Sequence, residues 1–595
     1  MMRALITGVA ALWIAGCGPS SGGHGDDPQS IEVTPANATI TIANGVNAPS
    51  IDYVAIGHYA DGHTETLDDA TFSLDNDATI LGSLSSATFA ANGNAAGTGT
   101  VTATSGTASG ATGVNVVVHR TNLDPTAPPG SDMNFPDQPP YGAAAPTIAY
   151  PLDNAVMPIT AAAPHIQWEG VAAPGDLFRV RIVGGLATVD TIIGVTAGFK
   201  LDALPLPADW QVITASAHAQ PIHVFVDHYD TATGAQRSLE VAVRAVSSQV
   251  TGVIYYWDLS QGQMQRIDGA GRALAIPNPP ASPADANNHC VACHVVSRDG
   301  RYLAGELWGG GDKGAVFDLS DPAILTGNPA PTVAPITTAS YTSLFSTFDP
   351  TGHRLLVNPG TQLQLVDPLA GTTVATLGTP LPAANAAHPS WSPDGNSIAF
   401  INNITLGGNA APWAVDYDRG DLQIIPVLGP DTFGAPVSLV SAASVDPAFA
   451  APSWPSFTPD SAYVAYGAGT NSRGRNTVNT TEVMYPGSLF LVPTGGGAPI
   501  TLATACGGIR DCYLPNFSPY DDGGYIWIVF YSLRDYGNAL AGTKGTQRRQ
   551  MWITGIDKSK LGTGADPSLV PYWLPDQDSA TENMSAFWAV PPPPP

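Results

Sequence analysis

Apolar and polar residues alternate with a period of two over much of the chain. Residues 31–43 read IEVTPANATITIA, and residues 97–118 read GTGTVTATSGTASGATGVNVVV. Successive side chains of a β-strand point to opposite faces, so this alternation predicts strands with one buried face. Asp61-Gly62, between two such runs, is typical of a tight turn. Residues 31–119 are therefore expected to form a β-sandwich.

A second sandwich is predicted over residues 147–248. The runs FRVRIVG (178–184) and IHVFVDHY (222–229) have the strand pattern, and Trp168 is expected in the core. The stretch before it, residues 120–146, is rich in proline and has little periodicity. That composition predicts a semi-stiff linker.

A repeat sets the pattern of residues 249–595. Each copy has an aromatic or apolar residue, a turn and an apolar strand, and the copies begin about 43 to 66 residues apart. The five clear copies are VSRDGRYLAG (296–305), FDPTGHRLLV (348–357), WSPDGNSIAF (391–400), FTPDSAYVAY (457–466) and FSPYDDGGYIWIVF (517–530). In the Pro-Asp-Gly form, proline presets its φ and glycine takes a positive φ, which reverses the chain between strands. A repeat of this length with several strands per unit predicts a β-propeller.

Composition fits this all-β prediction. Only 12% of the 595 residues are charged, while glycine and proline number 63 and 54, which favours short strands with many turns over long amphipathic helices. The formal net charge of −26 at pH 7 repels nucleic acid and anionic membrane surfaces. Neither is therefore expected as a direct partner.

Three parts of the chain resemble known families. The order of the strand patterns in residues 31–119 resembles the bacterial immunoglobulin-like domain of group 2, and residues 147–248 are similar to a fibronectin type III sandwich. The stretch HPSWSPDGNSIAF (388–400) is similar to the TolB-type and WD-type propeller repeat. The count of repeated strand segments predicts six blades, with SAFWAV (585–590) supplying the strand that closes the ring beside the first blade.

The N-terminus has the features of an export signal. The sequence MMRALITGVAALWIAGC has one arginine before an apolar run that is too short for a mature membrane span. Its end, residues 14–17, resembles a bacterial lipobox, which implies that residues 1–16 are removed and that Cys17 is lipidated. Residues 17–30 are then a flexible tether. Gly18 after the cysteine implies an outer-membrane lipoprotein that faces the periplasm or the cell surface, with the lipid as its only membrane contact.

One short stretch carries the candidate chemistry. Cys290, Cys293 and His294 form the pattern C-x-x-C-H, which is typical of c-type haem attachment. The two thiols can each bond one vinyl group of a single porphyrin, and the following histidine can bind the iron. We therefore expect one covalent haem c, with His294 as the proximal ligand and a function in extracytoplasmic electron transfer. The redox partner is unknown, and an electron carrier or binding protein is favoured over an enzyme.

The place of this motif in the repeat is unusual. CHVVSRDG (293–300) aligns with HPSWSPDG (388–395), so the haem is expected at one face of the propeller, near the central channel. Two residues are candidates for the sixth iron ligand. His388 holds the matching place in another blade, and Met584 lies in the closing strand.

Other interpretations of the motif stay open. Cys290 and Cys293 can form a disulfide in a non-redox TolB-like scaffold that binds a protein or a glycan at the cell surface. A zinc site would need further soft ligands at matching spacing. With Cys17 assigned to the lipid, the remaining two cysteines are Cys506 and Cys512 in ACGGIRDCY (505–513), which are most simply a disulfide that closes a short loop.

Overall fold

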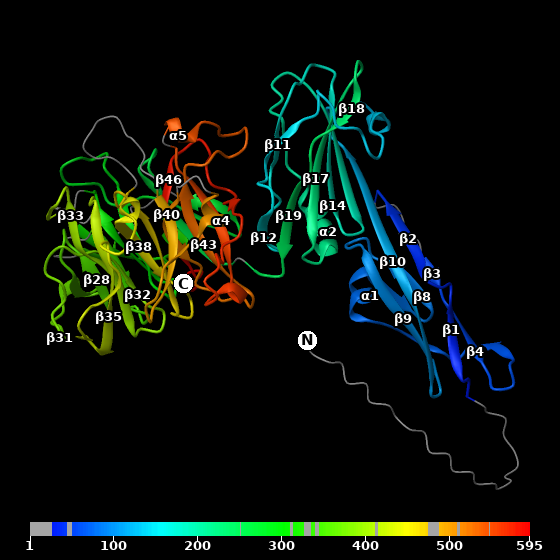
Figure 1. Ribbon diagram of the computed structural model, residues 1–595, viewed down its shortest axis with the longest axis horizontal. Helices are drawn as coiled ribbons and strands as arrows, with labels where there is room; N and C mark the ends of the chain where they lie inside the picture. The colour runs from blue at the N-terminus through cyan, green and yellow to red at the C-terminus, as the bar shows by residue number, and fades with distance from the viewer. Residues whose placement is uncertain are drawn as a thin grey trace, which may run out of the picture. The chain divides into compact units, whose positions relative to one another are not determined.

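Strands far outnumber helices, which confirms the predicted all-β class (Figure 1). The computed structural model describes residues 27–44, 50–249, 251–309, 313–325, 335–338, 344–410, 415–473, 487–507, 512–546 and 548–594. The predicted signal peptide and Cys17 lie outside these residues. None of the helices in the described ranges is long and apolar enough to cross a membrane.

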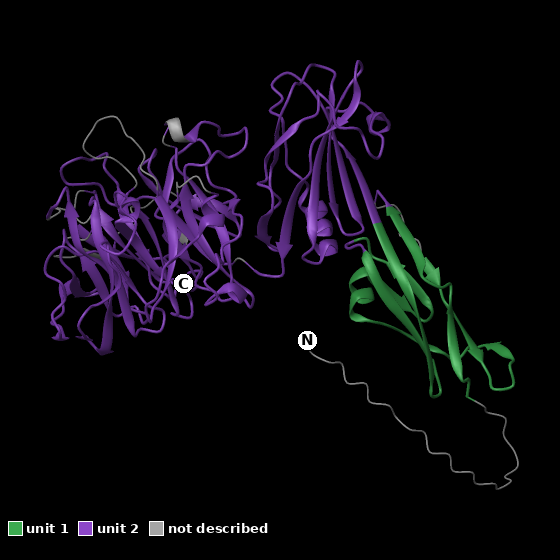
Figure 2. Cartoon of the chain, viewed as in Figure 1, with its two compact units in different colours: residues 1–42, 47–93, 97–117 green, residues 43–46, 94–96, 118–595 purple. Residues whose placement is uncertain are grey.

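The chain divides into two compact units (Figure 2). Unit 1 contains residues 1–42, 47–93 and 97–117, and unit 2 contains residues 43–46, 94–96 and 118–595.

Unit 1 is built from short strands whose buried and exposed positions alternate. Its elements are β1 (Ser30–Thr34), β2 (Ala38–Ala43), β3 (Ser50–Asp52), β4 (Val54–His58), β5 (Thr64–Thr66), β6 (Thr71–Leu74), α1 (Asn76–Leu81), β7 (Gly82–Ser85), β8 (Thr88–Ala91), β9 (Gly97–Ser105) and the start of β10 (Ala108–Leu123). The expected turn lies between β4 and β5, where Gly62 has a φ of 90°. Helix α1 was not predicted. It begins after Asp75, whose carboxylate accepts a hydrogen bond from the Ala78 amide at 2.8 Å.

Unit 2 begins with a second strand domain. One sheet has the order β12-β19-β17-β14-β15 and ends on the last six residues of β10, and a smaller sheet has the order β11-β13-β16. Their bounds are β11 (Thr147–Tyr150), β12 (Ala155–Pro158), β13 (Ile166–Glu169), β14 (Leu177–Gly184), β15 (Ala187–Gly194), β16 (Asp202–Ala203), β17 (Pro221–Asp230) with its partner β18 (Gly234–Arg237), and β19 (Val241–Val246). Trp168 is fully buried against Phe178, as predicted. Helix α2 (Pro207–Ala217) was not predicted.

The linker predicted over residues 120–146 packs against this domain, which corrects that prediction. Arg120 to Leu123 continue β10, and Phe135 is buried in a cluster with Leu177 and Ile192. The guanidinium of Arg179 donates to the carbonyl oxygens of Phe135 and Pro136. A proline-rich segment forms few backbone bonds of its own, so its carbonyl groups are available to satisfy buried cations on the neighbouring sheet.

The rest of unit 2 is the propeller, with six blades in the described part of the chain. The first blade contains β20 (Val253–Asp258), β21 (Gln263–Asp268), β22 (Gly271–Leu274) and β46 (Asn583–Ala589), the second contains β23 (Val291–Val296), β24 (Tyr302–Leu307), β25 (Lys313–Asp318) and β26 (Thr337–Thr338), and the third contains β27 (Phe345–Phe348), β28 (Leu355–Asn358), β29 (Gln364–Asp367) and β30 (Thr372–Thr373). The fourth blade contains β31 (Leu377–Gly378), β32 (Ala387–Trp391), β33 (Ser397–Leu406), β34 (Asn409–Ala410), β35 (Arg419–Gly429), β36 (Thr432–Phe433) and β37 (Val437–Val440). The fifth blade contains β38 (Ala451–Phe457), β39 (Tyr463–Gly469), β40 (Gly487–Pro493) and β41 (Ile500–Thr501), and the sixth contains β42 (Cys512–Phe517), β43 (Tyr525–Ser532), β44 (Gln550–Asp557) and β45 (Tyr572–Trp573).

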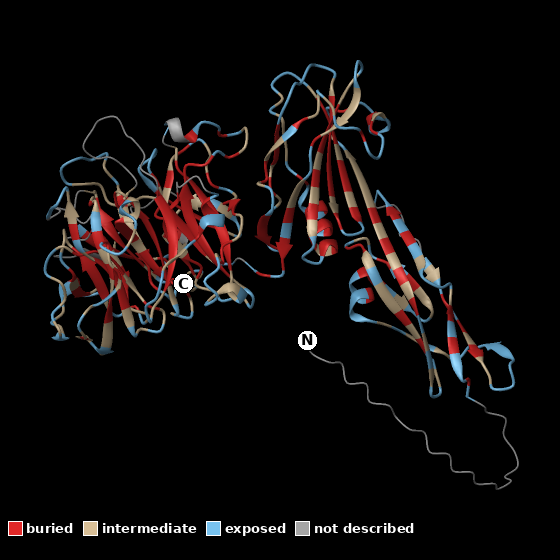
Figure 3. Cartoon of the chain, viewed as in Figure 1, coloured by how far each residue is buried: buried red, intermediate tan, exposed pale blue. Residues whose placement is uncertain are grey.

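The last strand closes the ring as predicted. β46 pairs antiparallel with β20, so one blade combines the first strands of the propeller with the final one. Closure in this way joins the two ends of the propeller in one blade. The strands are buried along most of their length (Figure 3), which is expected where each sheet packs between two neighbours.

The repeated turns are held by a side chain and not only by backbone bonds. Ser297 Oγ lies 2.5 Å from Asp299 Oδ1, and Ser392 Oγ lies 2.6 Å from Asp394 Oδ1. Each serine also accepts the amide of the residue five positions later. The motif therefore fixes the turn that joins the innermost strand of a blade to the next strand.

Candidate functional site

The propeller contains a pocket of about 640 Å³ on its axis, lined by residues of the innermost strands. Each of the six blades contributes one residue from its innermost strand. In the five blades that have the repeat turn, this residue comes four positions before the residue that begins the turn. These six residues are Cys293, Phe345, His388, Trp454, Leu514 and Ser585. A pocket of this size is within the range of small-ligand sites.

A local distortion of the strands creates this lining. Five of the six residues have a left-handed backbone, with φ values of 51° for Cys293, 49° for His388, 54° for Trp454, 51° for Leu514 and 53° for Ser585. The pairing register shifts at each of these places. Residues other than glycine rarely adopt such a backbone, and strained positions of this kind gather at ligand sites. The strain is therefore a shared property of the pocket wall.

The bulge explains how two consecutive residues of the C-x-x-C-H motif reach the pocket. In a regular strand Cys293 and His294 would point to opposite faces. Here both line the pocket, because the bulged residue is inserted into β23 without a partner. Cys290 precedes β23 and does not line the pocket, but it lies close enough to raise the pKa of Cys293.

Both cysteines of the motif are thiols in this structure. Burial is the main cause that raises the pKa of Cys290 to about 11, and the Glu306 carboxylate adds to it. Burial raises the pKa of Cys293 further still. At neutral pH these groups are protonated, unlike the thiolates of dithiol redox motifs.

His294 has an unusual environment for a buried histidine. Neither ring nitrogen has a hydrogen-bond partner of normal geometry among the described residues. Burial lowers the pKa of His294 to about 4, against a weaker upward effect of the Tyr255 backbone. The side chain is therefore a neutral imidazole with a free lone pair beside the pocket, which is the form that binds metals.

His388, the first candidate for the distal ligand, lines the same pocket. Its side chain is 2% exposed, and its Nε2 has no partner among the described residues. Burial lowers the pKa of His388 to about 3, and the charge of Arg473 acts in the same direction. Met584, the second candidate, lies in β46 and also lines the pocket.

Several pocket residues were not predicted from the sequence. Ser346 Oγ and Trp454 Nε1 are buried atoms without a partner in the described structure. Arg473 pairs with Asp416 at 3.3 Å, and Arg549 forms an ion pair with Glu582. Alignment of all the repeats on the turn residue would have identified the place of Trp454, but not the arginines, which come from outside the repeat.

The second cysteine pair is also close together. Cys506 ends α4 (Ala503–Cys506) and Cys512 begins β42, and both side chains are buried. Burial and a hydrogen bond with Cys512 raise the pKa of Cys506 well above its usual value. The proximity is compatible with the predicted disulfide, which stays a prediction.

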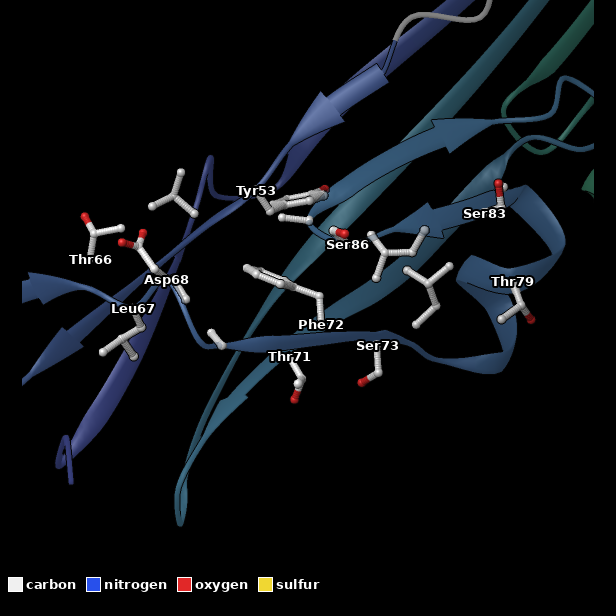
Figure 4. Close-up of a pocket in the computed structure, with 17 residues that line it drawn as sticks. Tyr53, Thr66, Leu67, Asp68, Thr71, Phe72, Ser73, Thr79, Ser83 and Ser86 are labelled. Atoms are coloured by element: carbon white, nitrogen blue, oxygen red, sulfur yellow. The ribbon is translucent and has the colours of Figure 1, made fainter. Parts of the chain in front are cut away.

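Unit 1 has a wide pocket of its own, of about 930 Å³, between residues 53 and 87 (Figure 4). Tyr53, Leu67 and Phe72 form apolar parts of its wall, and Asp68 is the one carboxylate in its lining. Among the described residues that line it there is no cluster of titratable side chains. The pocket on the propeller axis, called the channel pocket below, is therefore the stronger candidate site. The described residues contain no group of three or more His, Cys, Asp or Glu side chains placed to hold a metal ion.

Comparison with solved structures finds neighbours of low identity and low TM-score. No protein-family model matches the chain, and no curated protein does. A protein described as TolB from Agrobacterium tumefaciens is 13% identical over 57% of this chain and 99% of its own, with a TM-score of 0.29. A quinonprotein alcohol dehydrogenase-like protein from Bacteroides thetaiotaomicron is 9% identical over 75% of this chain and 99% of its own, with a TM-score of 0.30. A chain of a nidogen/laminin complex is 10% identical over 57% of this chain and 99% of its own, with a TM-score of 0.34.

Proposed function

We propose that this protein is a propeller scaffold that binds a ligand in the pocket on its axis. The observation that carries the proposal is a set of buried polar atoms without partners in the described structure: both nitrogens of His294, Nε2 of His388, Oγ of Ser346 and Nε1 of Trp454. All four residues line the one pocket. An unsatisfied buried polar atom costs about 1–3 kcal/mol, so a ligand that pairs with several of them would recover that energy.

The lining also indicates the kind of ligand. Aromatic side chains from several strands, among them Trp257, Phe345, Trp454 and Phe587, surround the few polar atoms. Such walls hold a flat or apolar group by stacking, while the polar atoms fix its orientation. A protein segment or a glycan at the cell surface fits this description.

Binding of the exported full chain to arrays of bacterial envelope glycans and peptides tests this function. A hit of the wild type should be lost on Trp454→Ala and weakened on Ser346→Ala. Thr71→Ala in the unit 1 pocket is the matched control and should leave binding unchanged. Equal binding by wild type and Trp454→Ala would reject the channel pocket as the site.

Haem c is the second candidate, and the specific observation in its favour is the state of His294. A neutral imidazole with free nitrogens directly follows a buried thiol on the pocket wall, with the second thiol nearby. Cys290 and Cys293 would hold the porphyrin through thioether bonds, and His294 would bind the iron. A bound haem supplies one-electron transfer, so the protein would act as an extracytoplasmic electron carrier with a redox partner.

Mass spectrometry and haem staining of protein matured in a periplasm with haem-attachment machinery separate the two candidates. Haem c adds one macrocycle to the mass and gives a sharp α-band in the reduced spectrum. Cys290→Ser with Cys293→Ser should abolish both signals. A chain of unmodified mass, whose Cys290 and Cys293 resist alkylation until they are reduced, would exclude haem c and leave the scaffold function as the remaining candidate.

The place of the protein is proposed from its N-terminus. We propose that Cys17 is lipidated and anchors the chain to the outer membrane, facing the periplasm or the outside. Labelled palmitate should be incorporated into the wild type and not into Cys17→Ser. Fractionation of Cys17→Ser with the membranes would contradict the anchor.

A further inference from the structure

The ring of His388 is packed between aromatic side chains of the pocket wall. It stacks on Trp454 with ring centroids 3.9 Å apart, and Phe345 packs edge-on against it at 4.6 Å. The hydroxyl oxygen of the fully buried Tyr417 lies 3.1 Å from Nδ1 of His388. These neighbours hold the plane of the imidazole. His388 lines the pocket, and its buried Nε2 has no partner among the described residues.

The hydrogen bonds of Tyr417 decide where the His388 proton lies. The single hydroxyl proton of Tyr417 is donated to the Pro452 carbonyl at 2.7 Å, since a carbonyl can only accept. Tyr417 Oη must then accept from His388, so we assign the proton of the neutral ring to Nδ1. The Trp454 amide N–H is also directed at Nδ1 and would favour the opposite tautomer, but at 3.4 Å it is at the weak limit of a hydrogen bond. The shorter contacts of Tyr417, 2.7 Å to the Pro452 carbonyl and 3.1 Å to Nδ1, outweigh it. Nε2 is therefore the unprotonated nitrogen of the ring, and it has no partner among the described residues.

This arrangement is the one that metal-binding histidines use. A histidine that binds a metal through one nitrogen almost always donates its other N–H to an oxygen, which fixes the tautomer and the ring orientation. The chain His388–Tyr417–Pro452 provides that oxygen and extends it by a second bond. Met584 has no comparable support. Its thioether is a flexible side chain that is only partly buried on β46.

We propose that His388, and not Met584, is the second axial ligand of the iron bound by His294. The inference rests on the proposed haem function. His294 on β23 and His388 on β32 would then each offer one imidazole nitrogen to the iron, and Tyr417 would be a positioning residue that acts through His388. The pocket would serve an electron carrier and not a centre that binds small gaseous ligands.

The experiment uses the full chain, matured with haem, and its ultraviolet–visible and electron paramagnetic resonance spectra. The wild type should be low-spin in both oxidation states and should not bind carbon monoxide. His388→Ala should keep the covalent haem, become high-spin and bind carbon monoxide, and added imidazole should restore the low-spin spectrum. That rescue also shows that the variant is folded. Met584→Leu is the matched control, because it changes the rival ligand in the same pocket and should leave the spectrum unchanged.

Tyr417→Phe adds a readout that a merely structural residue would not give. It removes the oxygen that accepts from Nδ1, so the low-spin state should persist while the midpoint potential shifts. Loss of the low-spin signal on Met584→Leu, or a wild type that is already high-spin and binds carbon monoxide, would overturn the assignment of His388 while leaving the haem in place. A wild type without covalent haem would instead overturn the haem function, and the ligand assignment with it.

Discussion

The imidazole of His388 lies flat on the indole of Trp454, with ring planes 17° apart. The two residues hold the same place in the innermost strands of neighbouring blades, and both have a left-handed backbone. Phe345 of β27 packs edge-on against both rings. The stack therefore joins three blades at the wall of the pocket.

Removal of the indole should loosen these blades. An aromatic pair is worth about 0.5–1.5 kcal/mol beyond its buried area, so we expect Trp454→Leu to lower the opening free energy of β32 and β38 by at least that amount. Trp454→Phe keeps a ring in the stack and should retain most of the protection. Hydrogen–deuterium exchange of the amides of the two strands measures the effect. Equal exchange in wild type and Trp454→Leu would show that the stack does not hold the blades together.

The turn glycines offer a matched pair of substitutions. Gly300 and Gly395 occupy the same turn in two blades, with φ values of 74° and 80°. A Cβ at Gly300 would lie 2.5 Å from the Val590 carbonyl oxygen, whereas at Gly395 its nearest neighbour would be Pro350 at 3.6 Å. Both alanine variants should lose about 1–2 kcal/mol from the left-handed backbone.

Gly300→Ala should lose clearly more than that, because the chain after the closing strand β46 must move. Thermal unfolding followed by circular dichroism compares the two variants with the wild type. If both variants melt at the same temperature, the contact between this turn and the chain after β46 does not affect the stability of the fold.

The propeller was predictable because a short run of consecutive residues specifies each of its turns. Ser392, Asp394 and Gly395 form a turn that needs only the residues of the turn itself, so the repeat could be read from the sequence. The bulge before each turn was not predictable, since Cys293, Trp454 and Leu514 have no residue type in common. It depends on the packing of six blades around one axis, which no single repeat specifies.

The same reason explains the other differences. His294 and His388 could be predicted as ligands because imidazole binds iron. Which nitrogen of His388 carries the proton depends on Tyr417 and Pro452, which lie far from it in the sequence. The packed segment over residues 120–146 depends on Arg179 and Arg181, far along the chain. Long-range partners of this kind leave no periodic pattern.

The paired thiols Cys506 and Cys512 should be oxidised in the exported protein. They are buried neighbours, and Arg534 Nη2 lies 3.7 Å from the sulfur of Cys512. A native disulfide contributes about 2–4 kcal/mol, with the lower value expected for a short loop. The double variant Cys506→Ala with Cys512→Ala should lower the urea midpoint accordingly. Alkylation of both thiols in the native exported protein, without prior reduction, would contradict the disulfide.

Asp190 on β15 should give the second domain an acid-sensitive stability. Arg181 donates to its two carboxylate oxygens at 2.7 and 2.8 Å, and His119 Nε2 lies 3.2 Å away. Burial acts to raise the pKa of Asp190, but the hydrogen bonds of Arg181 and His119 and the charge of Arg181 outweigh it and lower the pKa to about 2. A carboxylate whose folded pKa is depressed stabilises the fold above its unfolded pKa, which is near 3.8.

The contribution is therefore complete above about pH 4 and disappears as the pH falls through about 2. The difference between the two pKa values corresponds to about 2 kcal/mol at neutral pH. Asp190→Asn should remove it and leave the buried Arg181 with the exposed Asp137 as its anion, so the amides of β14 and β15 should exchange faster at pH 7. Below about pH 2 the wild type and the variant should converge, because Asp190 then becomes protonated in the folded as well as the unfolded chains of the wild type. A constant difference between them from pH 7 to pH 2 would show that the ionised carboxylate is not the source of the stability.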